Sequence, residues 1–297
     1  MRVAITGAGG LLGGALLRKV IASGHDVVAL SGSLYPMVGI EIVSWIAEQD
    51  WTYTAAALHD VEVVIHAGAH IPSDHGDVAE AVRCFEANAL GTLNLLRAVE
   101  YAGVRRFIYV SGTNTLNPRS DFVFEDDPIG CEHSPHYLGS KVLGEIYCRA
   151  AMARGLDVLI VRASSIYGLG MKTGVILNFA KSIKRGEPIW LQNGGRFQAD
   201  YIWRDDVVAV LTQAIVCHHQ SVVNLGSGVA SSVLDVAKLL VKIFDADPSL
   251  IKCEVGSDQI ERGGFAPVDI TRARDWFGFS PTPLRDGLMQ LLVSGEA

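Results

Sequence analysis

The most constraining feature of the chain is a glycine-rich turn that follows its first apolar segment. Residues 3–6 predict a strand, residues 11–23 predict a helix, and the turn between them reads Gly7-Ala8-Gly9-Gly10-Leu11-Leu12-Gly13. Gly7 permits the tight turn, Gly10 lets a pyrophosphate approach the backbone, and Gly13 lets the helix pack closely on the strand. The helix N-terminus offers free N–H groups and a positive dipole end. In this context the spacing predicts a dinucleotide site made by Gly7, Gly10, Leu11, Leu12 and Gly13.

Strands and helices alternate through the first half of the chain. The predicted strands cover residues 26–30, 61–67, 106–111 and 157–162, and helical patterns cover 78–101 and 137–154. This alternation predicts an α/β chain, a doubly wound parallel-sheet Rossmann fold with a smaller C-terminal substrate lobe. We expect the dinucleotide-binding Rossmann domain over residues 1–165, with a return of the chain at about 200–240. The substrate-binding lobe is then a mixed α/β unit over 166–297.

Charge and cysteine content exclude several classes of partner. The 32 acidic residues outnumber the 25 basic ones, which argues against a nucleic-acid-binding surface. The apolar stretch at 207–217 is too short to span a membrane, and no signal-peptide pattern precedes the first strand. The five cysteines contain no C-x-x-C, which favours reduced thiols over disulfides or a zinc site. We therefore expect a cytoplasmic protein with a small-molecule substrate and no metal, membrane or nucleic-acid partner.

The end of the second predicted strand bears on the choice of cofactor. In NAD sites an Asp or Glu at this point usually accepts hydrogen bonds from the ribose. Here the strand leads into Ser31-Gly32-Ser33, without a carboxylate. This would leave room for a 2′-phosphate, yet no adjacent Arg or Lys is present to neutralise one. The segment predicts NAD(P) as the cofactor, with Ser31 in its site and a slight preference for NADP.

A tyrosine and a lysine lie one helical turn apart in Tyr137-Leu138-Gly139-Ser140-Lys141. This spacing puts the phenol and the ammonium on one helix face. A nearby ammonium favours the phenolate and lowers the tyrosine pKa from about 10 toward neutral pH. Tyr137 could then exchange a proton with a hydroxyl or carbonyl group. The pair alone is common on solvated helix faces, so its meaning depends on its companions.

Polar residues in two other segments support this interpretation. Ser111-Gly112-Thr113 follows an apolar strand, so hydroxyl groups lie at a carboxyl end, where α/β sheets bind ligands. Asn88 lies in the middle of a predicted helix, an unfavourable place for Asn without a specific partner.

With these residues in view, the chain resembles the extended short-chain dehydrogenase/reductase superfamily, in its NAD-dependent epimerase/dehydratase branch. The resemblance covers nearly the whole chain. It rests on residues 64–69, 88–96, 109–113, 137 with 141, 161–168, 205–207, 224–228, 269–273 and 284–288.

The resemblance implies roles for individual residues. Tyr137 would be the general acid/base, and Lys141 would lower its pKa and hydrogen-bond the nicotinamide ribose. Thr113 stands where the family has a Ser or Thr that holds the reacting oxygen, and Asn88 matches an Asn that supports the proton relay. Further expected cofactor contacts are Ala67, Gly68, Ala69, Ser111 and Ala163, and expected substrate contacts are His70, Thr113, Ser164, Arg196 and Arg262. The helices at 78–101 and 137–154 would form a homodimer interface.

The chain also departs from the family pattern at three points. Ala163 replaces a common proline after Arg162. The segment at 44–46 lacks the Asp that many members place against the adenine, and Trp45 could line that pocket instead. Ala199 stands where nucleotide-sugar members have a diphosphate-binding Arg, for which Arg196 or Arg262 could substitute.

These observations favour one function and leave two others open. The favoured one is an NAD(P)-dependent oxidoreductase that transfers a hydride to or from a hydroxyl or carbonyl carbon of a small polar, sugar-like metabolite. The first alternative is a nucleotide-sugar 4-epimerase or dehydratase with tightly bound NAD. The second is a non-catalytic NAD(P)-sensing protein, against which the set of Asn88, Thr113, Tyr137 and Lys141 argues.

Overall fold

A seven-stranded, wholly parallel sheet is the largest unit of the computed structural model, which describes residues 1–32, 40–45, 50–253 and 263–293. The strand order is β10-β6-β5-β4-β1-β2-β3. Its strands are β1 (Arg2–Thr6), β2 (Asp26–Ser31), β3 (Glu41–Ser44), β4 (Val63–His66), β5 (Arg106–Gly112), β6 (Asp157–Ala163) and β10 (Ser221–Leu225). The order reverses between β1 and β4, the point where such sheets form a ligand crevice. The predicted Rossmann fold is confirmed.

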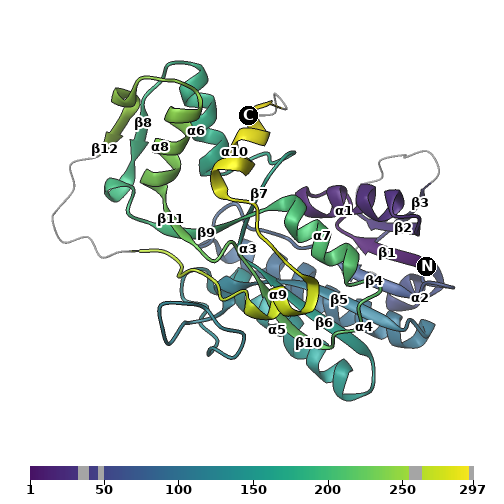
Figure 1. Cartoon of the computed structure of the whole chain (residues 1–297). Coiled ribbons are helices and arrows are strands. Elements are labelled where there is room, and N and C mark those ends of the chain that lie inside the picture. The colour runs from purple at the N-terminus through teal and green to yellow at the C-terminus, as the bar shows by residue number, and fades with distance from the viewer. Residues whose placement is uncertain (33–39, 46–49, 254–262, 294–297) are drawn as a thin grey trace.

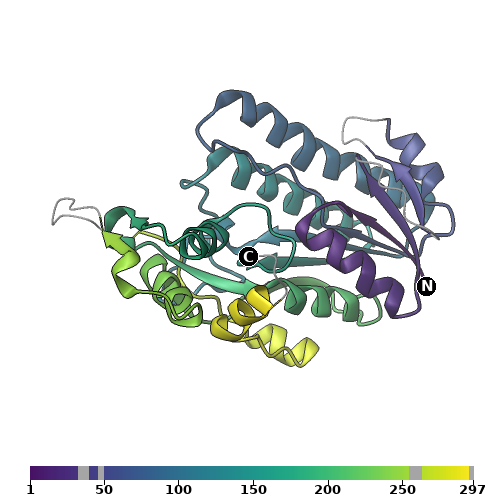
Figure 2. The same ribbon diagram turned by 90° about the horizontal axis from the view of Figure 1, so that it is seen from above.

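Helices cover both faces of this sheet, giving three layers (Figures 1 and 2). One face packs against α1 (Leu11–Ala22), α7 (Arg204–Gln213) and α9 (Thr271–Phe277). The other face packs against α2 (Trp51–Ala57), α4 (Gly91–Ala102) and α5 (Pro135–Ala153). Strand residues alternate between the two cores, as the period of two in a strand requires: Val3 and Ile5 face one core, and Ala4 faces the other.

The long helix expected over residues 78–101 is present but interrupted. It consists of α3 (Val78–Cys84), a π-helical turn η1 (Phe85–Leu90) and α4. The π turn widens the helix at Asn88. Such turns are rare and often occur at functional sites.

The lobe stands at one end of the large sheet (Figure 1). Its small sheet has the order β11-β9-β7, and two further strands, β12 and β8, pair with each other. Its strands are β7 (Ser165–Tyr167), β8 (Ile189–Leu191), β9 (Gln198–Trp203), β11 (Ala230–Ser232) and β12 (Ile251–Cys253), and its helices are α6 (Val175–Lys184), α8 (Val233–Ile243) and α10 (Leu284–Val293). A separate core joins Tyr167, Trp203, Leu240 and Leu288. The described residues also form three short 3-10 turns, η2 (Thr113–Thr115), η3 (Gln192–Gly195) and η4 (Pro248–Leu250).

The part of the chain that returns to the large sheet differs from the expected range of 200–240. Only α7 and β10 (residues 204–225) join its layers, because β9 lies in the small sheet and α8 packs in the lobe core. In addition, α9 packs beneath the large sheet, where Arg272 Nη1 donates to the Val222 carbonyl at 2.7 Å. The apolar residues Ile270 and Ala273 bury this segment against the sheet.

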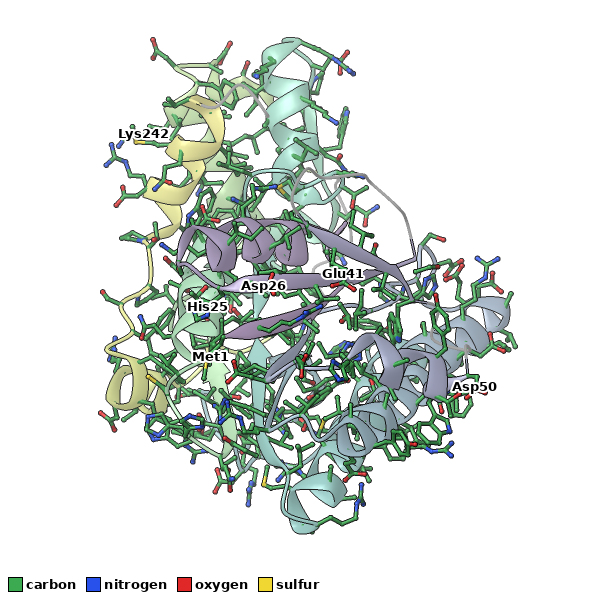
Figure 3. All side chains as sticks on the ribbon, turned by 90° about the vertical axis from the view of Figure 1, so that its right-hand side faces the viewer. Met1, His25, Asp26, Glu41, Asp50 and Lys242 are labelled. Atoms are coloured by element: carbon green, nitrogen blue, oxygen red, sulfur yellow. The ribbon has the colours of Figure 1, made fainter. Side chains whose placement is uncertain are left out.

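Ion pairs occupy the amino edge of the sheet, opposite the crevice. Arg2 contacts both Asp26 and Glu41, and Figure 3 shows those two acids near Met1. Parallel strands thus place their starts, and these charges, at one edge and leave the carboxyl edge for a ligand. Among the described residues, no helix is both long and apolar enough to cross a membrane.

Candidate active site

A cavity of about 480 Å³ lies at the carboxyl edge of the large sheet. The ends of β1, β2, β4, β5 and β6 reach it, together with the first turns of α1 and α5. Its expected members are Gly7, Gly10, Leu11, Leu12, Gly13, Ser31, Ala67, Gly68, Ala69, Ser111, Tyr137, Lys141, Ala163 and Ser164. The structure therefore brings together every residue predicted to bind the cofactor.

The glycine loop packs against α1 and the segment after β4 only because Gly7 and Gly13 have no side chains. Gly7 has a φ of +71°, and a Cβ there would lie 2.6 Å from the Gly68 Cα. A Cβ on Gly13 would overlap the Gly7 carbonyl group. No side chain caps the first turn of α1, whose N-cap is Gly10. Its free N–H groups are therefore available to a pyrophosphate.

A buried hydrogen bond chain fixes the turn against β4. His66 is wholly buried, and burial, with Lys141 as a smaller cause, lowers its pKa to about 3, so the ring is neutral. Its Nε2 is 2.9 Å from the Thr92 hydroxyl, which donates to the Asn88 carbonyl. His66 therefore donates from Nε2, and its Nδ1 accepts from the Thr6 hydroxyl at 2.6 Å. The Thr6 oxygen in turn accepts from the Gly68 N–H at 3.0 Å, next to Gly7.

Ser111 places an unpaired hydroxyl in the cavity. Its residue is 5 % exposed, and its Oγ has no hydrogen-bond partner within the described parts of the chain. Leaving a buried hydroxyl unpaired costs free energy, and such groups are usually satisfied by a partner. The unpaired Oγ therefore fits a site built for a polar ligand, as do the glycine loop and the open end of α1.

Burial dominates the ionisation of Tyr137 and Lys141. It raises the pKa of Tyr137 to about 12, with Cys84 as a smaller cause. It lowers the pKa of Lys141 to about 8, although Cys148 and Glu145 oppose this. The structure therefore shows a raised pKa for Tyr137 in place of the expected lowering by the ammonium, because burial of the phenol dominates. At neutral pH the phenol keeps its proton and the lysine keeps its charge, so Tyr137 can act as a proton donor.

Asn88 connects two segments rather than lining the cavity. Its Oδ1 accepts from the His70 N–H at 2.7 Å, and its Nδ2 donates to the His70 carbonyl at 2.9 Å. Nδ2 also donates to the Ser140 hydroxyl at 3.0 Å, and that hydroxyl donates to the Tyr137 carbonyl at 2.7 Å. Asn88 thus ties the segment after β4 to the first turns of α5.

His70 itself does not line this cavity, whereas its neighbours Ala69 and Ile71 do. Its Nε2 lies 2.6 Å from a carboxylate oxygen of Glu80, which is 7 % exposed. Arg83 holds the other carboxylate oxygen at 3.2 Å. The imidazole is therefore anchored to Glu80 of α3.

The other predicted residues lie at different distances from the cavity. Thr113 is buried just beyond the lining residues Ser111 and Gly112. Arg196 lines a second cavity, of about 580 Å³, in the lobe. Arg262 lies outside the described residues. The second cavity is also lined by the aromatic rings of Phe179, Trp190 and Phe197.

Several lining residues were not anticipated from the sequence. They are Gly9, Ile71, Val110, Gly112, Asn114, Leu138 and Ile166. Most of them adjoin a predicted residue, so their position next to a strand end could have identified them as cavity residues. No three His, Cys, Asp or Glu side chains of the described segments converge in a way that could hold a metal ion.

The fold and this site define a dinucleotide-binding enzyme of the Rossmann type. The model of the NAD dependent epimerase/dehydratase family matches residues 3–226, and the chain belongs to this family. The chain is thus an NAD-dependent enzyme of the extended short-chain dehydrogenase/reductase type, as the sequence predicted.

Individual relatives match over nearly their whole length. A UDP-glucose 4-epimerase from Mycolicibacterium smegmatis is 28 % identical, over 95 % of this chain and 94 % of its own. The structure of MoeE5 in complex with UDP-glucuronic acid and NAD is 25 % identical, with a TM-score of 0.85 over 99 % of this chain and 100 % of its own. The structure of the Thermotoga maritima UDP-glucose 4-epimerase with UDP-glucose is 25 % identical, with a TM-score of 0.82 over 97 % of this chain and 96 % of its own.

Proposed function

We propose that the chain oxidises and re-reduces a hydroxyl-bearing carbon of a nucleotide-linked sugar with an NAD that stays bound, as an epimerase or dehydratase does. The observation that carries this proposal is the pair of cavities. One combines the glycine loop with Tyr137 and Lys141, and the other is a separate aromatic cavity of about 580 Å³ in the lobe. A small free sugar would need no second cavity of this size. The relatives named above, which act on or bind UDP-sugars, support the same substrate class.

The residues present fit NAD. The N–H groups at the start of α1 would bind the pyrophosphate, Ser31 would contact the adenosine ribose, and Lys141 would bind the nicotinamide ribose. When bound, the nicotinamide supplies the acceptor and donor of the hydride. Gly10 would let the pyrophosphate approach the backbone, while Gly7 and Gly13, which leave no room for side chains, keep the turn packed against the segment after β4 and against α1.

Within the protein, Tyr137 would move the proton. Its phenol donates a proton to a carbonyl oxygen in the reduction step, and its phenolate accepts a proton from a hydroxyl group in the oxidation step. The charge on Lys141 favours the phenolate that the oxidation step requires. Thr113 would hold the reacting oxygen, with Ser111 as a further hydrogen-bond donor in the cavity. Asn88 would support the relay by holding the start of α5 in place.

The lobe cavity would bind the nucleotide. Phe179, Trp190 and Phe197 offer rings on which a base can stack, and Arg196 offers a positive charge for the diphosphate. Ser164 lies at the end of β6 and donates to Asp200 at 3.3 Å, which places it between the large sheet and the lobe. His70 would influence substrate binding only indirectly, by holding its neighbours Ala69 and Ile71 in the wall of the cofactor cavity.

A net dehydrogenase or reductase is the second candidate. Ala199, where an Arg would bind a diphosphate, is 3 % exposed and offers no charge. A substrate without a diphosphate would suit that feature. Such an enzyme must exchange its cofactor at each turnover, whereas an epimerase keeps it. An NAD(P)-sensing protein would show no turnover at all.

Analysis of the bound cofactor and of the products separates these candidates. We would denature freshly gel-filtered protein with acid, identify the released nucleotide by mass spectrometry, and incubate native protein with UDP-glucose, UDP-galactose and UDP-glucuronic acid. We expect about one NAD per chain, a new sugar product, and no net absorbance change at the nicotinamide band. A protein without cofactor that accumulates NAD(P)H in proportion to product would instead identify a dehydrogenase. Tyr137→Phe serves as the inactive control.

We further infer a homodimer in a reducing compartment. The face formed by α3, η1, α4 and α5 exposes Val78, Val82, Phe85 and Ile146, an apolar set suited to a second copy. All five cysteines are free thiols, in keeping with a cytoplasmic protein. Light scattering should give twice the chain mass of 31.9 kDa, and Phe85→Asp should halve it.

A further inference from the structure

Lys141 is the one charged side chain among the described residues that line the cofactor cavity, and its ammonium lies over an aromatic ring. Its Nζ is 4.3 Å from the ring centroid of Tyr109 on β5. Tyr109 is completely buried, and its hydroxyl donates to the Lys141 carbonyl at 3.3 Å. The same ring therefore contacts both the backbone and the side-chain charge of Lys141.

Gly144 makes this close approach possible. It lies three residues after Lys141 on α5, on the side that faces β5. A Cβ at this position would overlap the Tyr109 hydroxyl and lie 2.7 Å from its Cζ. Any other residue would therefore push the ring away from α5 and from the ammonium.

The other charged and titratable groups around Lys141 come from four elements. On α5 these are Tyr137, Glu145 and Cys148. Arg162 lies on β6 and His66 on β4, and Cys84 on α3 contributes to the raised pKa of Tyr137. Arg162 holds both oxygens of Glu145, at 2.8 and 2.6 Å, so that carboxylate is already compensated. The buried polar residues Asn88 of η1 and Thr113 of η2 have side chains that do not titrate.

Burial strongly opposes the charge on Lys141 and lowers its pKa to about 8. Since Arg162 already pairs with Glu145, that carboxylate attracts the ammonium less than a free one would. Neutral His66 adds no repulsion. The face of an aromatic ring attracts a cation most strongly where water is excluded, as it is here. The Tyr109 ring is therefore well placed to supply the remaining stabilisation.

We propose that Tyr109 is a positioning residue for Lys141: its ring, held against α5 in the space left by Gly144, keeps the ammonium charged and directed at the cofactor cavity. This goes beyond the proposed function, which requires Lys141 to be charged but does not explain how a buried lysine keeps its charge. Only the catalytic consequence rests on the proposed function. The effect on Lys141 itself can be measured without any substrate.

The direct test is the titration of Lys141 by NMR in protein labelled with 13C at the lysine Cε. The chain has eight lysines, and Lys141→Arg assigns the signal. Tyr109 is replaced by phenylalanine and then by phenylalanines with one, two and three ring fluorines, which weaken the negative ring face at nearly constant size. We expect Lys141 in the Tyr109→Phe variant to have the same pKa as in the wild type. Each added ring fluorine should then lower the Lys141 pKa further, by about one unit in total.

Two matched variants complete the experiment. Gly144→Ala leaves Tyr109 intact but displaces its ring, so it should lower the Lys141 pKa as the fluorinated series does. Fluorotryptophan at Trp51, whose ring centroid lies 4.7 Å from the Arg97 guanidinium on the outer helices, should leave Lys141 unchanged. A Lys141 titration that stays constant through the fluorinated series would overturn the proposal. A stepwise shift without any change in UDP-sugar turnover would support the positioning effect and instead count against the catalytic role of Lys141.

Discussion

Tyr137 has a pKa of about 12 because its phenol is buried, so it holds its proton at neutral pH. A general acid must carry a proton, and this state suits the reduction step. Oxidation needs the phenolate, which nearby positive charge and hydrogen-bond donors stabilise at a buried position. Lys141 supplies part of that charge, and its own pKa of about 8 sets an upper limit on the working range. Turnover should therefore decline as the pH rises above 8, because deprotonation of Lys141 removes the charge that favours the phenolate.

Replacing Tyr137 by phenylalanine removes the hydroxyl and little else. We expect kcat for a UDP-sugar to fall by about 10² to 10⁴-fold, the usual contribution of a positioned acid or base. The amount of NAD per chain should stay constant, because the glycine loop is unaltered. Tyr101→Phe is the control, since Tyr101 is 76 % exposed on α4. Turnover within a few-fold of the wild type would assign the proton transfer to another group.

Ser31 is the residue that we expect to contact the adenosine ribose of the cofactor. It ends β2 and lines the cavity without an acidic neighbour among the described lining residues. We expect NADP to bind cofactor-free protein with a Kd within tenfold of that for NAD. Ser31→Asp should weaken NADP relative to NAD by about tenfold or more, because a carboxylate repels a 2′-phosphate, and tenfold corresponds to about 1.4 kcal/mol. Calorimetric titration measures both constants, with Ser31→Ala as the control. A wild type that already rejects NADP would contradict the slight NADP preference.

At the scale of elements, the strand–turn–helix unit at the start of the chain is the most sensitive to a single methyl group. In Gly13→Ala the new Cβ would lie 2.6 Å from the Gly7 carbonyl carbon, so α1 must move away from the turn. Overpacking of this kind costs about 1–3 kcal/mol, and a loss of that size in NAD binding corresponds to about 5- to 150-fold in affinity. Gly139→Ala on α5 is the control, because nothing lies within 4 Å of its added Cβ. Equal NAD content in the two variants would show that α1 need not pack so closely.

The elements also reveal what sequence patterns can and cannot predict. The central strands and the Tyr137–Lys141 spacing follow from local apolar runs and from the period of the helix, and they were predicted. β3 was missed because it is a short strand at the sheet edge whose residues are all partly exposed. α2 was missed although Asp50 caps it by accepting from the Thr52 N–H. The π turn at Asn88 depends on partners 18 and 52 residues away, His70 and Ser140, which no local pattern contains.

At the scale of the whole molecule, Asp200 joins the lobe to the Rossmann layers. This buried carboxylate on β9 accepts from the backbone N–H groups of Ser227, Gly228 and Val268, at 2.6, 3.0 and 3.0 Å. Ser227 and Gly228 follow β10 of the large sheet, and Val268 precedes α9. One side chain thereby ties β9 of the lobe to the segment that follows β10 and to the segment that precedes α9.

The stability of the whole molecule should depend on pH through His66. Its pKa is about 3 in the folded protein and 6.5 in an unfolded chain, so only the unfolded state binds the proton as the pH falls below 6.5. The stability that the neutral ring contributes is fully present above pH 6.5 and is lost as the pH falls. At pH 5 the free energy of unfolding is lower by about 2 kcal/mol. Urea unfolding at pH 7.5 and at pH 5.0 measures how much stability each protein loses on acidification. We expect His66→Gln to lose about 2 kcal/mol less than the wild type. His59→Gln, at a side chain that is 84 % exposed, should leave the difference unchanged. If His66→Gln lost as much stability on acidification as the wild type, the buried ring could not be the group that takes up the proton on unfolding.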